Sequence, residues 1–167
     1  MKKQITEANF FKILDKISNK RYAAMDGADE IFAEMLSTKD SSDLSHHIWS
    51  SMALELFLCG RLEDAVKAML EAIKIADQLD EEEKSILGAF YGDLSMFYES
   101  MHRYVDAYKY KEKELTNRVK FHGEDNLFTK ITKEDLKRLG KFTKYSTEEY
   151  DKLLDELQAD IDKNYAK

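Results

Sequence analysis

Two stretches of the sequence decide the fold: WSSMALELFLCGRLEDA at residues 49–65 and YGDLSMFYESMHRYVDA at residues 91–107. Each stretch opens with an aromatic residue, which is followed at helical intervals by a small residue and then by a large one. Gly60 in the first stretch and His102 in the second come next, ahead of Arg, a large apolar residue and a closing Asp–Ala pair. Self-similarity of this kind indicates a repeat architecture, in which each copy is one supersecondary unit.

The residue types at the matching positions suit two antiparallel helices joined by a tight turn. Ala53 and Ser95 are small, as is needed where two helices cross closely. Gly60 tolerates the left-handed conformation that such a turn requires, because it has no Cβ to clash with the backbone. Ala65 and Ala107 are expected where the second helix of each pair comes near the first.

These residues resemble the tetratricopeptide repeat, and the resemblance covers roughly residues 46–121. The copies are 42 residues apart from Ala65 to Ala107, whereas the ordinary repeat is about 34 residues long. The excess is close to two turns of about 3.6 residues each, so we expect longer helices rather than a disordered insertion.

The second copy departs from the pattern in three places. His102 stands at the turn, and Lys111 and Glu114 stand where the first copy has Met69 and Ala72. The far end of the second copy is therefore expected to pack differently from that of the first.

The whole chain is predicted to be one all-α domain in three parts. Residues 1–43 are expected to form a degenerate helical pair, 44–121 two long tetratricopeptide-like repeats, and 122–167 a short helix and a capping helix. The resulting fold is an antiparallel helical-hairpin repeat array, a tetratricopeptide-like α-solenoid, of about seven helices. The capping helix follows from one apolar stripe that would seal the open end of the array: Tyr150, Leu153, Leu154, Leu157, Ile161 and Tyr165.

Three helix starts follow from capping signals. Ser146 with Glu149 forms a capping box, and Asp80 with Glu83 forms a variant of one. Thr132 can cap the short helix that ends at about residue 140.

The composition favours helices and a reducing compartment. Proline, which breaks helices, is absent from a sequence that is 43% hydrophobic and 35% charged. Cys59 is the single cysteine, so no intramolecular disulfide can form. The start of the sequence lacks the apolar run of a signal peptide, and no stretch approaches the ~20 apolar residues of a membrane span. We expect a cytoplasmic protein with no membrane partner.

Charge is unevenly distributed along the chain. The net charge is -7 overall, but residues 103–144 carry 12 basic and 7 acidic side chains. This basic segment could favour an acidic partner, or nucleic acid together with the nearby tyrosines, although a solvated charged face is the commoner explanation.

No pattern predicts catalysis, a metal or another cofactor. His46 and His47 are adjacent, so on a helix they point about 100° apart and cannot chelate one ion as an i, i+4 pair could. Residues 81–83 are three glutamates at an expected helix start, where the macrodipole favours negative charge. Cys59 is expected to be a structural thiol.

The resemblance implies a protein-binding module that presents a groove lined by the first helix of each pair. We expect an adaptor that holds or blocks a partner protein; an immunity protein neutralising a bacterial toxin, nucleic-acid binding through 103–144, or a homodimer are the alternatives. The groove is expected to be apolar and acidic, and so to suit a basic or amphipathic segment. Its candidate residues are His47, Ser50, Leu54, Phe57, Leu58, Ala89, Asp93, Met96, Glu99 and Ser100.

Overall fold

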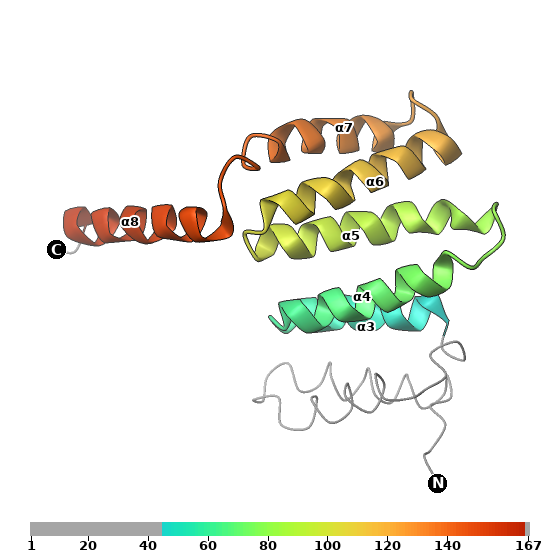
Figure 1. Cartoon of the computed structure of the whole chain (residues 1–167), viewed down its shortest axis with the longest axis horizontal. Helices are drawn as coiled ribbons and strands as arrows, with labels where there is room; N and C mark the ends of the chain where they lie inside the picture. Colours follow the sequence, from blue (N-terminus) through green and yellow to red (C-terminus); the bar gives the residue numbers. More distant parts are fainter. Residues whose placement is uncertain (1–44, 166–167) are drawn as a thin grey trace, which may run out of the picture. The chain divides into compact units, whose positions relative to one another are not determined.

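The computed structural model describes residues 45–165, and this part of the chain is entirely helical (Figure 1). The all-α prediction is therefore confirmed for these residues, whereas the helical pair predicted at 1–43 lies outside them. Six α-helices and one short 3₁₀ helix occur between residues 45 and 165: α3 (His46–Leu58), α4 (Leu62–Ala76), η3 (Glu83–Ile86), α5 (Leu87–Ser100), α6 (Tyr104–His122), α7 (Leu127–Leu139) and α8 (Thr147–Tyr165).

The chain divides into two compact units, Met1–Phe90 and Tyr91–Lys167. In the first unit, α3 packs against α4, and the large side chains of Trp49, Met52 and Leu56 on α3 are essentially fully buried. The buried side of α4 is built largely from alanines such as Ala65 and Ala72, whose small side chains suit a close approach of helices.

The turn after α3 and the turn after α5 have the same local geometry. Gly60 and His102 both have a positive φ, of 78° and 55°. Three backbone hydrogen bonds end α3 at residues 59, 60 and 61, and the same three end α5 at residues 101, 102 and 103. This is the Schellman pattern, in which a left-handed residue lets the last carbonyls of a helix find donors. His102 is a departure from the sequence pattern, but it takes the backbone conformation of the glycine.

The helices that follow these turns also begin alike. Arg61 and Arg103 have nearly the same backbone angles, φ -88° and ψ 67° against φ -87° and ψ 65°. In each case Nε donates to the aspartate three residues on, Asp64 at 3.0 Å and Asp106 at 2.9 Å. The Arg and Asp of the sequence pattern therefore act as a pair that closes the first turn of α4 and of α6.

In the second unit, α5 and α6 run antiparallel, as do α6 and α7 (Figure 1). The hydroxyl of Ser95 on α5 donates to the carbonyl oxygen of Ala107 on α6 at 2.8 Å. Both residues are fully buried, so the small side chain predicted at this crossing also makes a specific bond across it. The next helix, α7, packs antiparallel on α6, with Thr132 beside Glu114.

Two predicted helix starts are wrong in their details. The helix predicted to open at Asp80 is preceded by the 3₁₀ helix η3, and α5 begins at Leu87. The helix predicted to start at Thr132 begins earlier, at Leu127, where the side chain of Asn126 accepts a hydrogen bond from the Phe128 N–H at 2.9 Å. Thr132 instead lies within α7, where it is buried and its hydroxyl donates to Glu114.

The structure confirms the capping box at the start of α8 but does not show that α8 seals the end of a repeat array. The Ser146 N–H donates to Glu149 Oε2 at 2.8 Å, and the Glu149 N–H donates to Ser146 Oγ at 3.2 Å. Of the predicted stripe, Tyr150 is partly covered, but Leu153, Leu154 and Leu157 are exposed. The apolar periodicity was sufficient to predict the helix, but not what its stripe would contact.

Candidate functional site

The predicted groove residues on α3 form one helical face that is only partly covered. Leu54 is 37% exposed and Leu58 61% exposed, while Phe57 is half-buried. His47 is exposed, and its carbonyl accepts a 3.1 Å hydrogen bond from the buried Ser50 hydroxyl. Large apolar side chains therefore remain open to a partner on this face.

The predicted groove residues on α5 divide into open and engaged side chains. Met96 is 39% exposed, and Ser100 is exposed with its hydroxyl donating to the Met96 carbonyl at 3.0 Å. Ala89, in the first unit, is also exposed. The two acids differ from this pattern, because Asp93 and Glu99 are half-buried and interact with charged groups of α6 and α7.

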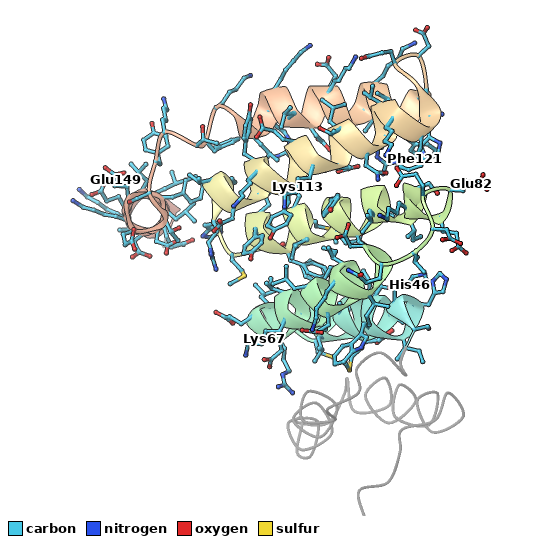
Figure 2. The ribbon with its side chains drawn as sticks, turned by 45° about the vertical axis from the view of Figure 1, so that its right-hand side comes forward. His46, Lys67, Glu82, Lys113, Phe121 and Glu149 are labelled. Atoms are coloured by element: carbon cyan, nitrogen blue, oxygen red, sulfur yellow. The ribbon has the colours of Figure 1, made fainter. Side chains whose placement is uncertain are left out.

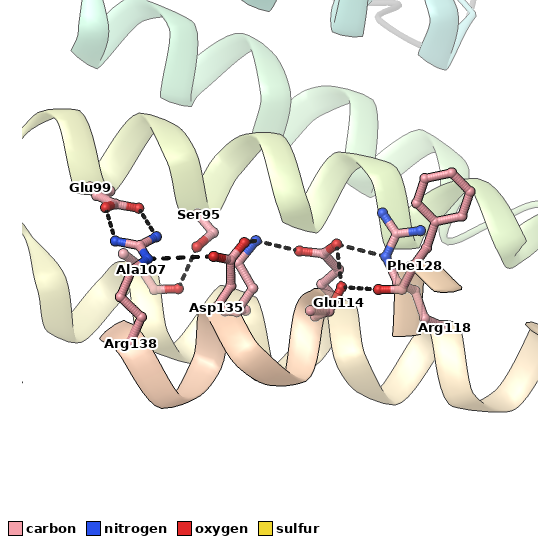
Figure 3. Close-up of polar contacts among 10 residues, drawn as sticks. Ser95, Glu99, Ala107, Glu114, Arg118, Phe128, Asp135 and Arg138 are labelled. Carbon is pink, nitrogen blue, oxygen red and sulfur yellow. Dashed lines mark hydrogen bonds and ion pairs between the residues drawn. The ribbon is translucent and has the colours of Figure 1, made fainter. Parts of the chain in front are cut away.

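Those charged groups form a continuous row, which we call the charge ladder (Figure 3). Its centre is Glu114, a buried carboxylate on α6. Glu114 Oε2 accepts from Lys111 Nζ at 2.7 Å and Glu114 Oε1 accepts from Arg118 Nε at 2.6 Å. The Thr132 hydroxyl of α7 donates to Oε1 at 3.0 Å. Both oxygens of a buried carboxylate thus have charged or hydroxyl donors, which is the condition for burying it without a large cost.

The ladder continues from Lys111 to α7 and back to α5. Lys111 Nζ lies 3.8 Å from Asp135 Oδ2, and Arg138 Nε lies 3.4 Å from Asp135 Oδ1. The guanidinium of Arg138 then holds both oxygens of Glu99, at 2.5 and 3.0 Å. Such a bidentate pair is geometrically specific as well as charge-assisted. The charges alternate along the whole row, which consists of Glu99, Arg138, Asp135, Lys111, Glu114 and Arg118.

Asp93 lies beside the ladder and has a strongly shifted pKa. Burial, together with the negative charge of Glu114, raises the pKa of its carboxyl to about 6 against the opposing effect of Lys111 and Arg118. The Asp93 carboxyl therefore titrates nearer to neutral pH than an ordinary aspartate does.

Glycine at position 92 of α5 leaves room for the buried carboxylate of Glu114. A Cβ at Gly92 would lie 2.9 Å from Glu114 Oε2 and 3.0 Å from its Cδ. The buried carboxylate thus occupies the space that any larger residue on α5 would need. Glycine costs helix stability, and here it accommodates the charged group.

Chemically, the charge ladder is a balanced set of ion pairs rather than a reactive centre. Its acids and bases pair with one another, and only Asp93 beside it has a raised carboxyl pKa. Shifted pKa values occur at catalytic sites and also in structural ion-pair networks. The alternation of charge and the three helices that the row joins are typical of a structural role, which fixes how α5, α6 and α7 pack.

Sequence reasoning identified part of this site without recognising it. The resemblance to the tetratricopeptide repeat predicts Glu99 and Asp93 as groove residues. Lys111 and Glu114 were recognised as departures from the repeat, and this departure was the signal of a buried charged pair. Asp135 carried no signal of its own, because its role depends on a helix pairing that periodicity does not give.

The described helices offer neither a cluster of metal ligands nor a membrane span. Among residues 45–165, no group of three or more His, Cys, Asp or Glu side chains is placed to hold a metal ion. The rings of His46 and His47 lie 4.0 Å apart at a tilt of 45°. Across this same span, the helices are all too short or too polar to cross a bilayer.

Comparison with known proteins gives no family. The chain matches no protein-family model, no curated protein sequence and no solved structure.

Proposed function

We propose that this chain is a non-catalytic protein-binding module made of tetratricopeptide-like hairpins, and that it holds or blocks a partner protein. The hairpin assignment is supported by the two turns, which share their positive φ, their three terminal hydrogen bonds and their Arg–Asp pair at a spacing of 42 residues. Arrays of such hairpins use helical faces to bind other proteins.

The observation that carries the proposal is the exposed apolar side chains on the first helix of each hairpin. Leu54 and Leu58 are one turn apart on α3, and Met96 lies on α5. All three are more than a third exposed, although each helix buries a large core face. Exposed apolar residues that gather on one helix face, as Leu54 and Leu58 do on α3, are typical of interaction sites.

The acids of the predicted groove change the expected partner. Glu99 is paired with Arg138, and Asp93 is half-buried near the positive charges of Lys111 and Arg118. The α3 and α5 faces therefore offer apolar anchors more than negative charge, so we propose that these faces bind an apolar or amphipathic segment rather than a strongly basic one.

Nucleic-acid binding through residues 103–144 is a weaker proposal. Basic residues of this segment pair with its own acids, as Lys130 does with Asp125 and Lys137 with Glu134. The ring of Tyr110 stacks on that of Tyr98 at 5.6 Å. Such pairing and stacking reduce both the free positive charge and the free ring faces that single-stranded nucleic acid needs.

The test is capture of a partner from native cytosol by the tagged chain, with identification by mass spectrometry. We expect a stoichiometric protein that is retained by the wild-type chain and lost from Leu58→Ser and from Met96→Ser. Leu127→Ser is the matched control, because Leu127 on α7 is 66% exposed but is not on either face. Equal capture by all four proteins would show that these faces do not bind, and recovery of nucleic acid alone would refute the proposal.

A further inference from the structure

The beginning of α8 is anchored on an aromatic cluster of its own unit. The ring of Tyr150 meets that of Tyr104 edge-on at 4.7 Å and that of Phe142 at 6.2 Å. Next to it, Nδ1 of His102 lies 2.8 Å from Oδ1 of Asp151. These contacts hold the first turn of α8 against the turn between α5 and α6.

Beyond this first turn, α8 carries an apolar stripe with no cover. Leu153 is 46% exposed, Leu154 36% and Leu157 57%. Their spacing places all three on one side of the helix. Figure 2 views α8, labelled at Glu149, nearly along its axis, with side chains extending outward all around it. A stripe of this kind is typical of a helix that packs on another helix.

The charges around the stripe specify what it can pack against. At about 100° per residue, Glu149 and Glu156 lie along one edge of the stripe, and Asp151, which is paired with His102, lies along the other. Lys152 lies on the opposite side of the helix, where it is 3.9 Å from Glu156. Carboxylates thus border the leucines, above all on the edge of Glu149 and Glu156, in a helix whose sequence has seven acidic and two basic residues.

This acidic edge disfavours a second copy of the chain and favours a basic partner. If two copies of α8 paired antiparallel through their leucines, the edge with Glu149 and Glu156 would face the same edge of the other copy, and like charges at these positions destabilise helix pairs. A helix with lysines or arginines beside its own apolar stripe would instead place opposite charges along this edge.

We infer that the face of α8 formed by Leu153, Leu154 and Leu157 is a docking site for a basic amphipathic helix of another protein. The apolar residues provide the burial and the carboxylates select the sign of the partner's charge. This site uses other residues than the α3 and α5 faces, so it stands or fails independently of the function proposed for them.

The test is binding of a synthetic helical peptide to the full-length chain, followed by fluorescence anisotropy. The probe has about four heptads with leucine at the a and d positions and lysine at e and g, a length that lets an isolated helix form. We expect saturable binding that weakens as salt is raised. Leu153→Ser with Leu157→Ser should weaken it at least tenfold, and Glu156→Lys should weaken it and reduce its salt dependence.

Three controls make the result decisive. The same peptide with glutamate at e and g should not bind, Leu127→Ser should bind like wild type, and circular dichroism should show unchanged helicity in every variant. Equal binding of the glutamate peptide, or an unchanged affinity of the Leu153→Ser, Leu157→Ser variant, would overturn the inference. A dimer in sedimentation velocity that the Leu153→Ser, Leu157→Ser change abolishes would overturn it in favour of a second copy.

Discussion

Replacing Asp93 with asparagine should stabilise the protein at neutral pH. Burial and the neighbouring Glu114 carboxylate raise the pKa of Asp93 from 3.8 to about 6. At pH 7.5 the side chain is therefore ionised in surroundings that favour its neutral form. Asparagine has nearly the same shape and carries no charge, so it removes this cost.

The size and sign of the effect follow from the two pKa values. The pKa is higher in the folded state than the 3.8 of the unfolded chain, so the folded state binds the proton more tightly. A difference of about two units at about 1.4 kcal/mol each would be about 3 kcal/mol for a fully buried group. Solvent screening of a half-buried carboxylate reduces this to about 1–2 kcal/mol. The cost is fully present above about pH 6 and disappears as the pH falls through about 4, because Asp93 is then protonated in both states.

The measurement is urea unfolding of wild type and Asp93→Asn at pH 7.5 and pH 4, followed by far-UV circular dichroism. The matched control is Asp125→Asn, which changes the net charge equally at a fully exposed residue. Trp49, the single tryptophan, is buried in the unit Met1–Phe90, so its fluorescence follows that unit separately.

We expect Asp93→Asn to unfold with a free energy about 1–2 kcal/mol higher than wild type at pH 7.5, and with nearly the same free energy at pH 4. Asp125→Asn should differ little from wild type at either pH. An advantage of Asp93→Asn that grows as the pH falls would contradict the reasoning, because it would mean that the native state stabilises ionised Asp93. So would an equal gain in Asp125→Asn, which would trace the effect to net charge.

Three further substitutions test the ladder and the first turn by urea unfolding. Glu114→Ala should lower the free energy of unfolding by about 2–4 kcal/mol, because it leaves Lys111 and Arg118 without their shared carboxylate. Adding Lys111→Met should recover part of this loss, and no recovery would show that charge is not the cause. Gly92→Ala should cost about 1–2 kcal/mol despite the better helix propensity of alanine, since the added Cβ would lie 2.9 Å from Glu114 Oε2. In the Glu114→Ala background the same change should be neutral or stabilising, and a persistent loss would contradict the proposed clash. Gly60→Ala should cost about 1–2 kcal/mol through its positive φ alone, because open space surrounds the added Cβ; a loss above about 4 kcal/mol would indicate a packing role instead.

The parts of the fold that the sequence could predict are those that depend on neighbouring residues. Gly60 marked the first turn because only a residue without Cβ adopts its conformation easily. Ser146 and Glu149 marked the start of α8 because both members of a capping box lie within four residues. The start of α7 was missed although Asn126 is itself a favourable cap; the threonine chosen in its place at position 132 proved to be a buried donor.

The parts that could not be predicted depend on which helix faces which. The repeat resemblance places Glu99 in the groove on α5, but its partner Arg138 is 39 residues away on α7. Likewise, periodicity predicts the apolar stripe of α8 but does not predict that the stripe remains exposed. Helical periodicity fixes the direction of a side chain around its own axis and carries no information on what meets it.

The departure of the second hairpin from the first explains why the ladder is where it is. The first hairpin has Met69 and Ala72, both fully buried, at the positions that Lys111 and Glu114 occupy in the second. An apolar surface tolerates a neighbour in several registers, since burial has no direction. A buried carboxylate does not, because sliding α7 along α6 by one turn would remove the Thr132 hydroxyl from Glu114 and separate Lys111 from its second carboxylate. Uncompensated buried charge costs several kcal/mol, so we expect the ladder to select one register of α7 against α6. Because the turn that leads to α8 follows α7, this register also sets where that turn begins.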